Sequence, residues 1–243
     1  MAPKSDTLGA VTLTSATLDD VPALIEIHTS AFKSDLFSSL MLSNRPEDAH
    51  QVLMRKSVDN WMEDSCAQII KAVDTDEHVL GWACWILKPA QIVALSADQN
   101  LKDTASTETT SQNPKKKTTQ QESDPTRVLG GLMHAEAVKW QNKYLNGKRY
   151  MVLQALATHP SSQGHGIGTK LVQWGVDKAD SEGLVCWAHA SPSGHFLYRN
   201  NGFEEVGRSE FDLGKWVPDE MRGEREWAMY TFRYMLRPAI NVT

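Results

Sequence analysis

Cysteine is scarce in this sequence of 243 residues, which contains only Cys66, Cys84 and Cys186. The odd number and the unrelated surroundings of these residues argue against a disulfide framework, and their spacing matches no cysteine metal site. Cys84 and Cys186 lie in apolar runs and are therefore expected to be buried thiols. We expect a reducing compartment and no bound metal.

Long hydrophobic runs and excess positive charge are also missing. No stretch approaches the roughly eighteen apolar residues that a membrane span requires, and residues 1–7 lack the apolar segment of a signal peptide. The formal net charge is −5 and the pI is near 5.9, whereas nucleic-acid binding usually needs a basic surface. A cytoplasmic protein that binds neither membrane nor nucleic acid is expected.

Apolar residues almost disappear between residues 96 and 127, where only Ala97, Leu101 and Ala105 interrupt a polar segment. Such a segment cannot bury enough surface to offset its loss of conformational entropy on ordering. We therefore expect a disordered insertion at 96–127 within a single domain that spans residues 1–243. Its run Pro114-Lys-Lys-Lys117 makes a nuclear location the alternative to a cytoplasmic one.

A glycine-rich turn between a strand and a helix is the most informative stretch. Residues 150–158 form an apolar run typical of a buried strand, which His159-Pro160 ends because proline cannot donate to a ladder. Gly164, Gly166 and Gly168 follow, and apolar residues at 172, 176 and 179 then recur at helical spacing. The first amides of a helix lack partners within it, so the turn is suited to binding an anion.

Two nucleotide-binding patterns fit this turn poorly. A Rossmann turn has G-x-G-x-x-G and an acidic residue about twenty positions later, but residues 184–190 contain no acid. A P-loop requires lysine before the hydroxyl residue, and Gly168-Thr169-Lys170 has the reverse order. A dinucleotide or nucleoside triphosphate is therefore disfavoured as the anion.

Two spaced motifs resemble a different family. Gln163-Gly-His-Gly166-Ile-Gly168 resembles the [RQ]-x-x-G-x-[GA] signature of the GNAT superfamily of acyl-CoA N-acyltransferases. About thirty residues later, Leu197-Tyr198 and Gly202-Phe203 are similar to that family's L-Y-x-x-x-G-F element. The resemblance implies an α/β fold of mixed α+β type with a mostly antiparallel central sheet. Six or seven strands are expected, flanked by helices, with a V-shaped splay between the fourth and fifth strands.

The hydrophobic patterns place elements that suit this fold. Strands are expected near 11–17, 67–73, 78–87, 150–158, 184–190, 203–210 and 227–236. Helices are expected near 19–32, 46–62, 128–145 and 169–180, and irregular structure near 33–43 and 215–225. Both faces of residues 78–87 are apolar, which indicates a strand covered on both sides.

The resemblance also implies a co-substrate and its binding residues. Acetyl-CoA would place its pantetheine arm along Leu156, Ala157 and Thr158. Its pyrophosphate would lie on the turn and helix start, formed by Gln163, Gly164, His165, Gly166, Ile167, Gly168 and Thr169. Tyr198 stands at the position of the family's general acid, which protonates the leaving thiolate.

The sequence leaves the identities of the proton acceptor and of the acyl acceptor undetermined. Family members carry Glu or His at positions matching Val152 or Gln154, and neither residue present here can act as a base. His189 is the best candidate, and His134, Glu136 or a water chain are the alternatives. The acceptor is expected to be an amine of a small molecule or a protein, with His28, Phe32 and Phe37 as candidate contacts. The functional alternative is a non-catalytic acyl-CoA-binding or regulatory module with the same fold. For either function a monomer or homodimer is expected.

Overall fold

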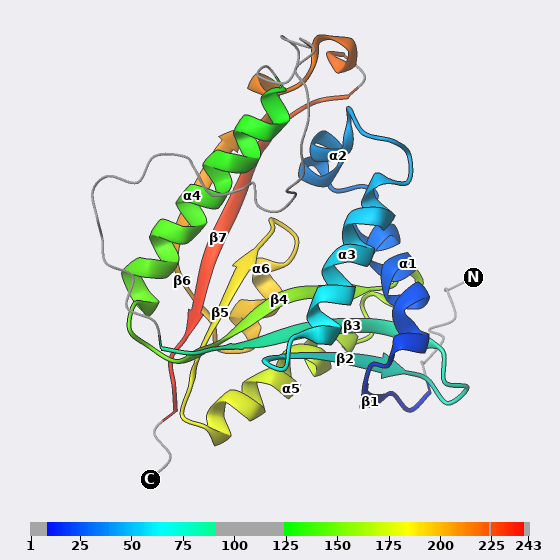
Figure 1. Cartoon of the computed structure of the whole chain (residues 1–243), viewed down its shortest axis with the longest axis vertical. Coiled ribbons are helices and arrows are strands. Elements are labelled where there is room, and N and C mark those ends of the chain that lie inside the picture. Colours follow the sequence, from blue (N-terminus) through cyan, green and yellow to red (C-terminus); the bar gives the residue numbers. More distant parts are fainter. Residues whose placement is uncertain (1–8, 91–123, 224, 241–243) are drawn as a thin grey trace, which may run out of the picture.

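A single sheet organises the protein. The computed structural model describes residues 9–90, 124–223 and 225–240. The sheet has seven strands in the order β1-β2-β3-β4-β5-β7-β6 (Figure 1). Only the β4–β5 pair is parallel, so the expected mixed, mostly antiparallel sheet is confirmed. The strands are β1 Thr12–Ser15, β2 Ala67–Val73, β3 Val79–Lys88, β4 Tyr150–Thr158, β5 Val185–Ala190, β6 Glu204–Asp212 and β7 Met229–Arg237.

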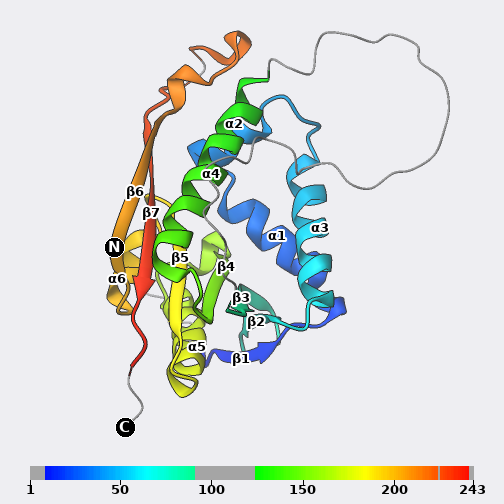
Figure 2. The same ribbon diagram turned by 60° about the vertical axis from the view of Figure 1, so that its left-hand side comes forward.

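Helices cover both faces of this sheet (Figures 1 and 2). One face carries α1 (Val21–Ala31), α3 (Ala49–Glu63) and α4 (Pro125–Leu145), and the other carries α5 (Ile167–Ser181) and α6 (His195–Asn200). Helix α2 (Leu36–Leu42) packs against the start of α4 and the end of the long β6–β7 hairpin. Short 3-10 helices occupy 18–20, 160–162, 213–215 and 219–221.

Strand β3 is buried on both sides, as its apolar pattern predicted. Trp82, Cys84 and Ile86 pack under α1 and α3, whereas Trp85 packs under α5. The indole N–H of Trp82 donates to the Leu24 carbonyl at 2.8 Å, so this buried polar group is satisfied. The thiols of Cys84 and Cys186 are buried as expected, and burial raises the pKa of each to about 12.

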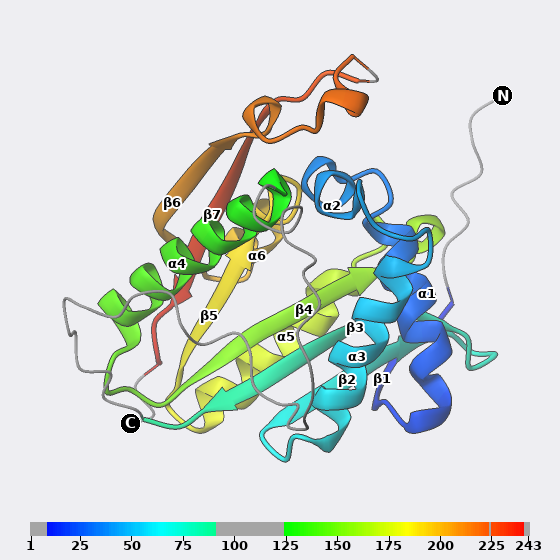
Figure 3. The same ribbon diagram turned by 45° about the horizontal axis from the view of Figure 1, so that its top comes forward.

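The two central strands separate along their length, which confirms the expected splay. The parallel register between β4 and β5 ends at the pair Leu153–Ala188, while β4 continues to pair with β3 as far as Thr158. A bulge at Gln154 interrupts the β3–β4 register at this point, and bulges bend the strand that carries them. Figure 3 shows β4 and β5 starting side by side and then diverging.

Two segments, 33–43 and 96–127, were expected to lack regular structure. The segment 33–43 was expected to be irregular, which is wrong, because Asp35 caps helix α2 through its side chain. The expected insertion at 96–127 lies outside the described residues up to residue 123, so its disorder stays a prediction. Its last residues are ordered, since Asp124 caps α4 and the helix begins at Pro125. None of the helices in the described part of the chain has the length and hydrophobicity needed to cross a lipid bilayer.

Candidate functional site

The glycine turn presents a row of unused main-chain amides at the start of α5. Gly164 and Gly166 both have φ +79°, a conformation that glycine adopts without steric cost. Within the described chain, the N–H groups of residues 164–169 make no hydrogen bond. Gln163 was also expected to offer its main-chain amide to the ligand, but its N–H donates to the Pro160 carbonyl at 3.4 Å. The amides available for an anion therefore begin at Gly164.

Gly168 serves the packing of two helices. A Cβ at this position would lie 3.1 Å from Cδ2 of Leu197, which belongs to α6. Gly164 and Gly166 instead face open space, where a Cβ would meet nothing within 4 Å. The first two glycines of the motif thus shape the turn, and the third lets α6 approach α5 closely.

The splay leaves main-chain groups of β4 without a strand partner. The N–H of His159 donates to the Leu80 carbonyl at 2.9 Å, and hydrogen-bonded pairs alternate along an antiparallel ladder. The main-chain groups of Ala157 consequently face β3, and those of Leu156 and Thr158 face the open slot. Of the three residues expected to line the slot with main-chain groups, only Leu156 and Thr158 point that way. The Gln163 side chain donates to the Thr158 carbonyl at 3.1 Å across this edge.

A cleft of about 610 Å³ brings the slot together with Tyr198. Leu156, Ala157, Thr158 and Gln163 form one part of its lining. Residues 164–169 follow Gln163 at the start of α5 and are not part of the lining. The other lining residues come from the end of α1, the α1–α2 connection, the start of α2, the β5–α6 loop, α6 and β7: Ala31, Phe32, Ser34, Asp35, Leu36, Ser191, Pro192, Ser193, Gly194, Leu197, Tyr198, Met229 and Tyr230.

Tyr198 lines this cleft, and its hydroxyl makes no hydrogen bond within the described chain. Its side chain is only 8% exposed, and the ring packs near Phe203 with centroids 5.9 Å apart. No described residue accepts or donates a hydrogen bond at its hydroxyl, so this group is not occupied by a structural contact. Burial raises the pKa of Tyr198 to about 12, because the phenolate would be poorly solvated. The phenol is therefore protonated at neutral pH.

His189 lines a different cavity, of about 350 Å³, between α4 and the sheet. Gln154 and His134 line the same cavity, and the His189 ring packs edge-on against Trp187 and Tyr234. Burial lowers the pKa of His189 to about 4, and the charge of His134 adds to the effect. The residue is exposed on the cavity side, and protein side chains flank its ring, which reduces the solvation of the imidazole. His189 and Gln154 are the first residues beyond the last β4–β5 pair.

Asp35 is a site residue that sequence reasoning missed. Its carboxylate lines the Tyr198 cleft and accepts a hydrogen bond from the Tyr230 hydroxyl at 2.7 Å. The pKa of Tyr230 lies well above its usual range, first because the phenol is buried and second because the Asp35 charge is adjacent. An Asp before an apolar helical run is an N-cap signal in sequence. Its position in a cleft depends on packing between distant segments.

The three candidate acceptor contacts have different surroundings. Phe32 lines the cleft, while Phe37 packs against Tyr230 and Phe232 behind it. His28 is not among the lining residues; its Nδ1 lies 3.1 Å from Nε2 of His50, and its ring stacks on Phe32. Burial, with a contribution from the His50 charge, lowers the pKa of His28 to about 3. His28 is thus placed to support Phe32.

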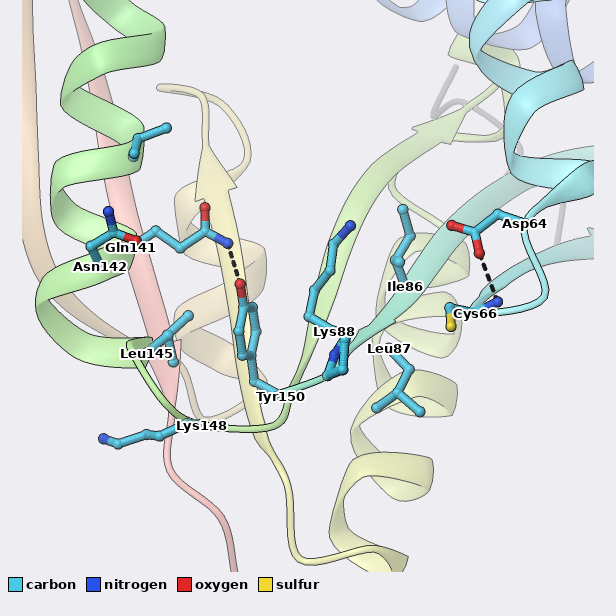
Figure 4. Close-up of a pocket in the computed structure, with 12 residues that line it drawn as sticks. Asp64, Cys66, Ile86, Leu87, Lys88, Gln141, Asn142, Leu145, Lys148 and Tyr150 are labelled. Carbon is cyan, nitrogen blue, oxygen red and sulfur yellow. Dashed lines mark hydrogen bonds between the residues drawn. The ribbon is translucent and has the colours of Figure 1, made fainter. Parts of the chain in front are cut away.

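A third cavity, of about 390 Å³, lies at the other end of the sheet and shares no residue with the Tyr198 cleft. Figure 4 shows it between the end of α4, the end of β3 and the start of β4. The Gln141 amide donates to the Tyr150 hydroxyl at 2.6 Å, and the Cys66 N–H donates to Asp64 at 2.8 Å. Across the described ranges, no three His, Cys, Asp or Glu side chains are grouped to hold a metal ion.

Comparisons with known proteins agree with the architecture. Residues 130–205 match the family model of the acetyltransferase (GNAT) domain. No curated protein matches the sequence. The fold resembles arylalkylamine N-acetyltransferase 2 from Aedes aegypti at 13% identity, covering 95% of this chain and 99% of that one, with a TM-score of 0.61. It also resembles a histone acetyltransferase HPA2-related protein from Corynebacterium glutamicum at 16% identity, covering 96% and 99%, with a TM-score of 0.54.

A GNAT phosphinothricin acetyltransferase from Sinorhizobium meliloti, solved in complex with AcCoA, is similar at 16% identity. The match covers 94% of this chain and 88% of that one, with a TM-score of 0.50. At such identities the solved structures establish the fold alone. Residues 130–205 are therefore identified as a GNAT acetyltransferase domain, within a chain whose overall fold resembles that of these solved acetyltransferases.

Proposed function

We propose that the protein is an N-acetyltransferase that transfers an acetyl group from acetyl-CoA to an amine. The observation that carries the proposal is the presence of two sets of unused amides, at the end of β4 and at the start of α5, together with one phenol that makes no hydrogen bond in the described chain. The amides belong to the slot at Leu156 and Thr158 and to the turn at 164–169, and the phenol is Tyr198. Each set has a separate task in binding or turning over a thioester.

The turn would hold the pyrophosphate. Hydrogen bonds to a charged group contribute about 1.5–3 kcal/mol each, so several amides suffice without a basic side chain. The positive end of the α5 dipole adds to this attraction. The structural similarity to the AcCoA-bound acetyltransferase from Sinorhizobium meliloti supports acetyl-CoA as the donor. The pantetheine amides would pair with the free edge of β4, as an added strand does.

The Tyr198 cleft supplies groups for direct transfer. The amine nitrogen attacks the thioester carbonyl and forms a tetrahedral intermediate, whose oxyanion is stabilised by a slot amide such as that of Leu156. The intermediate then expels the coenzyme A thiolate by breaking its carbon–sulfur bond. Tyr198 donates a hydrogen bond and then a proton to that thiolate, and the phenolate then takes up a proton from solvent. The raised pKa keeps the phenol in its donating form throughout the neutral range.

The nitrogen must lose a proton during this sequence, and His189 is the proposed acceptor. Its lowered pKa leaves the imidazole neutral at pH 7, which is the form able to take a proton. It lies at the vertex of the splay, in a cavity adjoining β4, although this cavity is separate from the Tyr198 cleft. His134 lines the same cavity and is the first alternative, with Glu136 and a water chain as the others.

A non-catalytic acyl-CoA-binding module is the second candidate. The observation that favours it is the residue pair at the family's base positions, where Val152 is buried and Gln154 has no basic group. Titration calorimetry with acetyl-CoA and release of free thiol in the presence of an amine library test the two functions together. Binding with thiol release supports the transferase, and binding without release across the library supports the module. Absence of acetyl-CoA binding contradicts both.

A further inference from the structure

We propose that Asp35 binds the ammonium group of the acceptor, and that the acceptor is a primary amine with an apolar, aromatic body. The inference deepens the proposed acetyltransferase function and rests on it. It is carried by the charge of the Tyr198 cleft, by the position of one carboxylate in it, and by the aromatic side chains around that carboxylate.

Asp35 is the only charged residue among the described residues that line the cleft. Within the described chain, no Lys, Arg or His forms an ion pair with it. A lone carboxylate in a partly enclosed cleft attracts cations more strongly than it would in bulk water. Alkylamines are cations at neutral pH, so the acceptor would arrive in the form that this carboxylate recognises, and its nitrogen would release one proton to solvent before it attacks the thioester.

The carboxylate is held in one orientation and keeps room for a ligand. Its Oδ1 accepts from the Tyr230 hydroxyl at 2.7 Å, and its Oδ2 accepts from the N–H and the hydroxyl of Ser38 at 2.8 and 2.9 Å. A carboxylate offers about four acceptor positions, and these bonds use three of them. The remaining position on Oδ1 is available to an ammonium N–H from the cleft.

The side chains around Asp35 select the body of the amine. Phe32, Leu36, Tyr230 and Met229 line the same cleft, and Met229 is 56% exposed. Aromatic faces attract both apolar groups and cations, so they favour an arylalkyl or similarly apolar ammonium ion. An acceptor with its own carboxylate would be repelled by Asp35, because the cleft offers no compensating positive side chain.

Helix capping by itself does not explain this arrangement. Asp35 caps α2, and an asparagine would cap equally well. Asparagine, however, has no charge with which to hold an ammonium ion. Asp35→Asn therefore separates the two roles, because it keeps the cap and removes the attraction.

The test measures binding of three matched compounds to the protein saturated with coenzyme A, which cannot donate an acetyl group. The compounds are phenethylamine, 2-phenylethanol and phenylalanine. Phenethylamine is expected to bind roughly ten- to a hundredfold more tightly than the neutral alcohol, and phenylalanine more weakly than phenethylamine. In Asp35→Asn the amine and the alcohol should bind alike, with coenzyme A affinity unchanged. Ser38→Ala keeps the carboxylate and should keep the preference for the amine.

Steady-state kinetics of Asp35→Asn provide a second test of the proposal. With phenethylamine and acetyl-CoA, Asp35→Asn should raise KM about ten- to a hundredfold and lower kcat much less, since the anchor binds the ground state. A preference for the amine that persists in Asp35→Asn overturns the proposal, as does equal binding of amine and alcohol by the wild-type protein. The wild-type comparison decides the question even if the variant fails to fold.

Failure of the Asp35 proposal can be distinguished from failure of the proposed acetyltransferase function. If acetyl-CoA binds and thiol is released while amine and alcohol bind equally, the role of Asp35 is refuted and the acetyltransferase stands. If acetyl-CoA neither binds nor reacts, the proposed function is refuted. The three compounds, titrated without coenzyme A, then still report directly on Asp35.

Discussion

The Tyr230 hydroxyl donates a hydrogen bond to the Asp35 carboxylate at 2.7 Å, across 195 positions in the sequence. The contact joins the last strand, β7, to the N-cap residue of α2, and both residues line the Tyr198 cleft. Because Tyr230 is buried and Asp35 lines the cleft, the bond links the packing of the hairpin to the geometry of the proposed acceptor site.

Tyr230→Phe is expected to destabilise the fold by about 1.5–3 kcal/mol, because it removes a buried hydrogen bond to a charged group. Urea denaturation monitored by tryptophan fluorescence measures the change. Tyr144→Phe is the matched control, since it removes a bond to the neutral carbonyl of Val206, with an expected cost of about 1 kcal/mol. Equal losses of unfolding free energy in the two variants would show that the charge of the Asp35 carboxylate adds no stability.

Tyr198→Phe is expected to lower kcat by roughly 10²–10⁴-fold while leaving the Kd for acetyl-CoA unchanged. The reason is that the hydroxyl meets no structural partner in the described chain, so its loss affects only the proton given to the thiolate. Stopped-flow thiol release and calorimetry measure the two quantities. A variant that retains wild-type turnover would remove Tyr198 from the mechanism.

His189→Gln is expected to lower kcat/KM by roughly 10²-fold or more if the imidazole accepts the amine proton. Because burial lowers the pKa of His189 to about 4, the imidazole is neutral above about pH 5 and becomes protonated below it. With an acceptor of low basicity, kcat/KM should therefore stay constant from pH 5 to 8 and decrease toward pH 4. An inflection near the ordinary histidine pKa of about 6.5 would contradict this assignment.

His134→Gln is the companion experiment, because His134 lines the same cavity. If His189 is the base, His134→Gln should leave turnover within a fewfold of wild type. The reverse ranking would transfer the role to His134.

Gly175→Ala is expected to destabilise the fold by about 1–3 kcal/mol or more through overpacking. Helix α5 lies against the Trp85 indole so closely that an added Cβ would come within 2.0 Å of the ring. Gly131→Ala is the control within another helix, where a Cβ would meet nothing within 4 Å. That variant should gain roughly 0.5–1 kcal/mol from higher helix propensity. Thermal and urea denaturation measure the stability of both variants. Similar changes in unfolding free energy would argue against a tight contact between Gly175 and the Trp85 ring.

Stability should fall between pH 7 and pH 5 because of His28. Its pKa is lowered to about 3 in the fold, first by burial and second by the His50 charge, against about 6.5 in the unfolded chain. As the pH falls below about 6.5, the unfolded state binds a proton that the folded state excludes. The loss at pH 5 relative to pH 7 is roughly 2 kcal/mol for this group. His28→Asn should flatten the slope of unfolding free energy with pH, which urea denaturation at a series of pH values measures.

Local sequence was enough to predict the strand, the glycine turn and the helix around residues 150–181, and the two-sided burial of β3. Each depends on interactions between residues close in the chain: proline ends a ladder, glycine adopts positive φ, and apolar spacing defines a buried face. Helix α2 was missed because seven residues give too little periodicity for such a prediction. The cap at Asp35 was its only clear signal.

The sequence by itself determined the candidate donor-binding turn, because its glycine spacing and hydrophobic periodicity depend on neighbouring residues, and it indicated the fold type through the resemblance of two motifs to a known family. Only the tertiary structure decided which side chains meet. It placed Tyr198 and Asp35 in one cleft, put His189 in another, and turned the amides of Leu156 and Thr158 to the open slot while those of Ala157 pair with β3. These relations arise from the splay of β4 from β5 and from the packing of α2 against β7. Such contacts between distant segments leave no pattern in the local sequence.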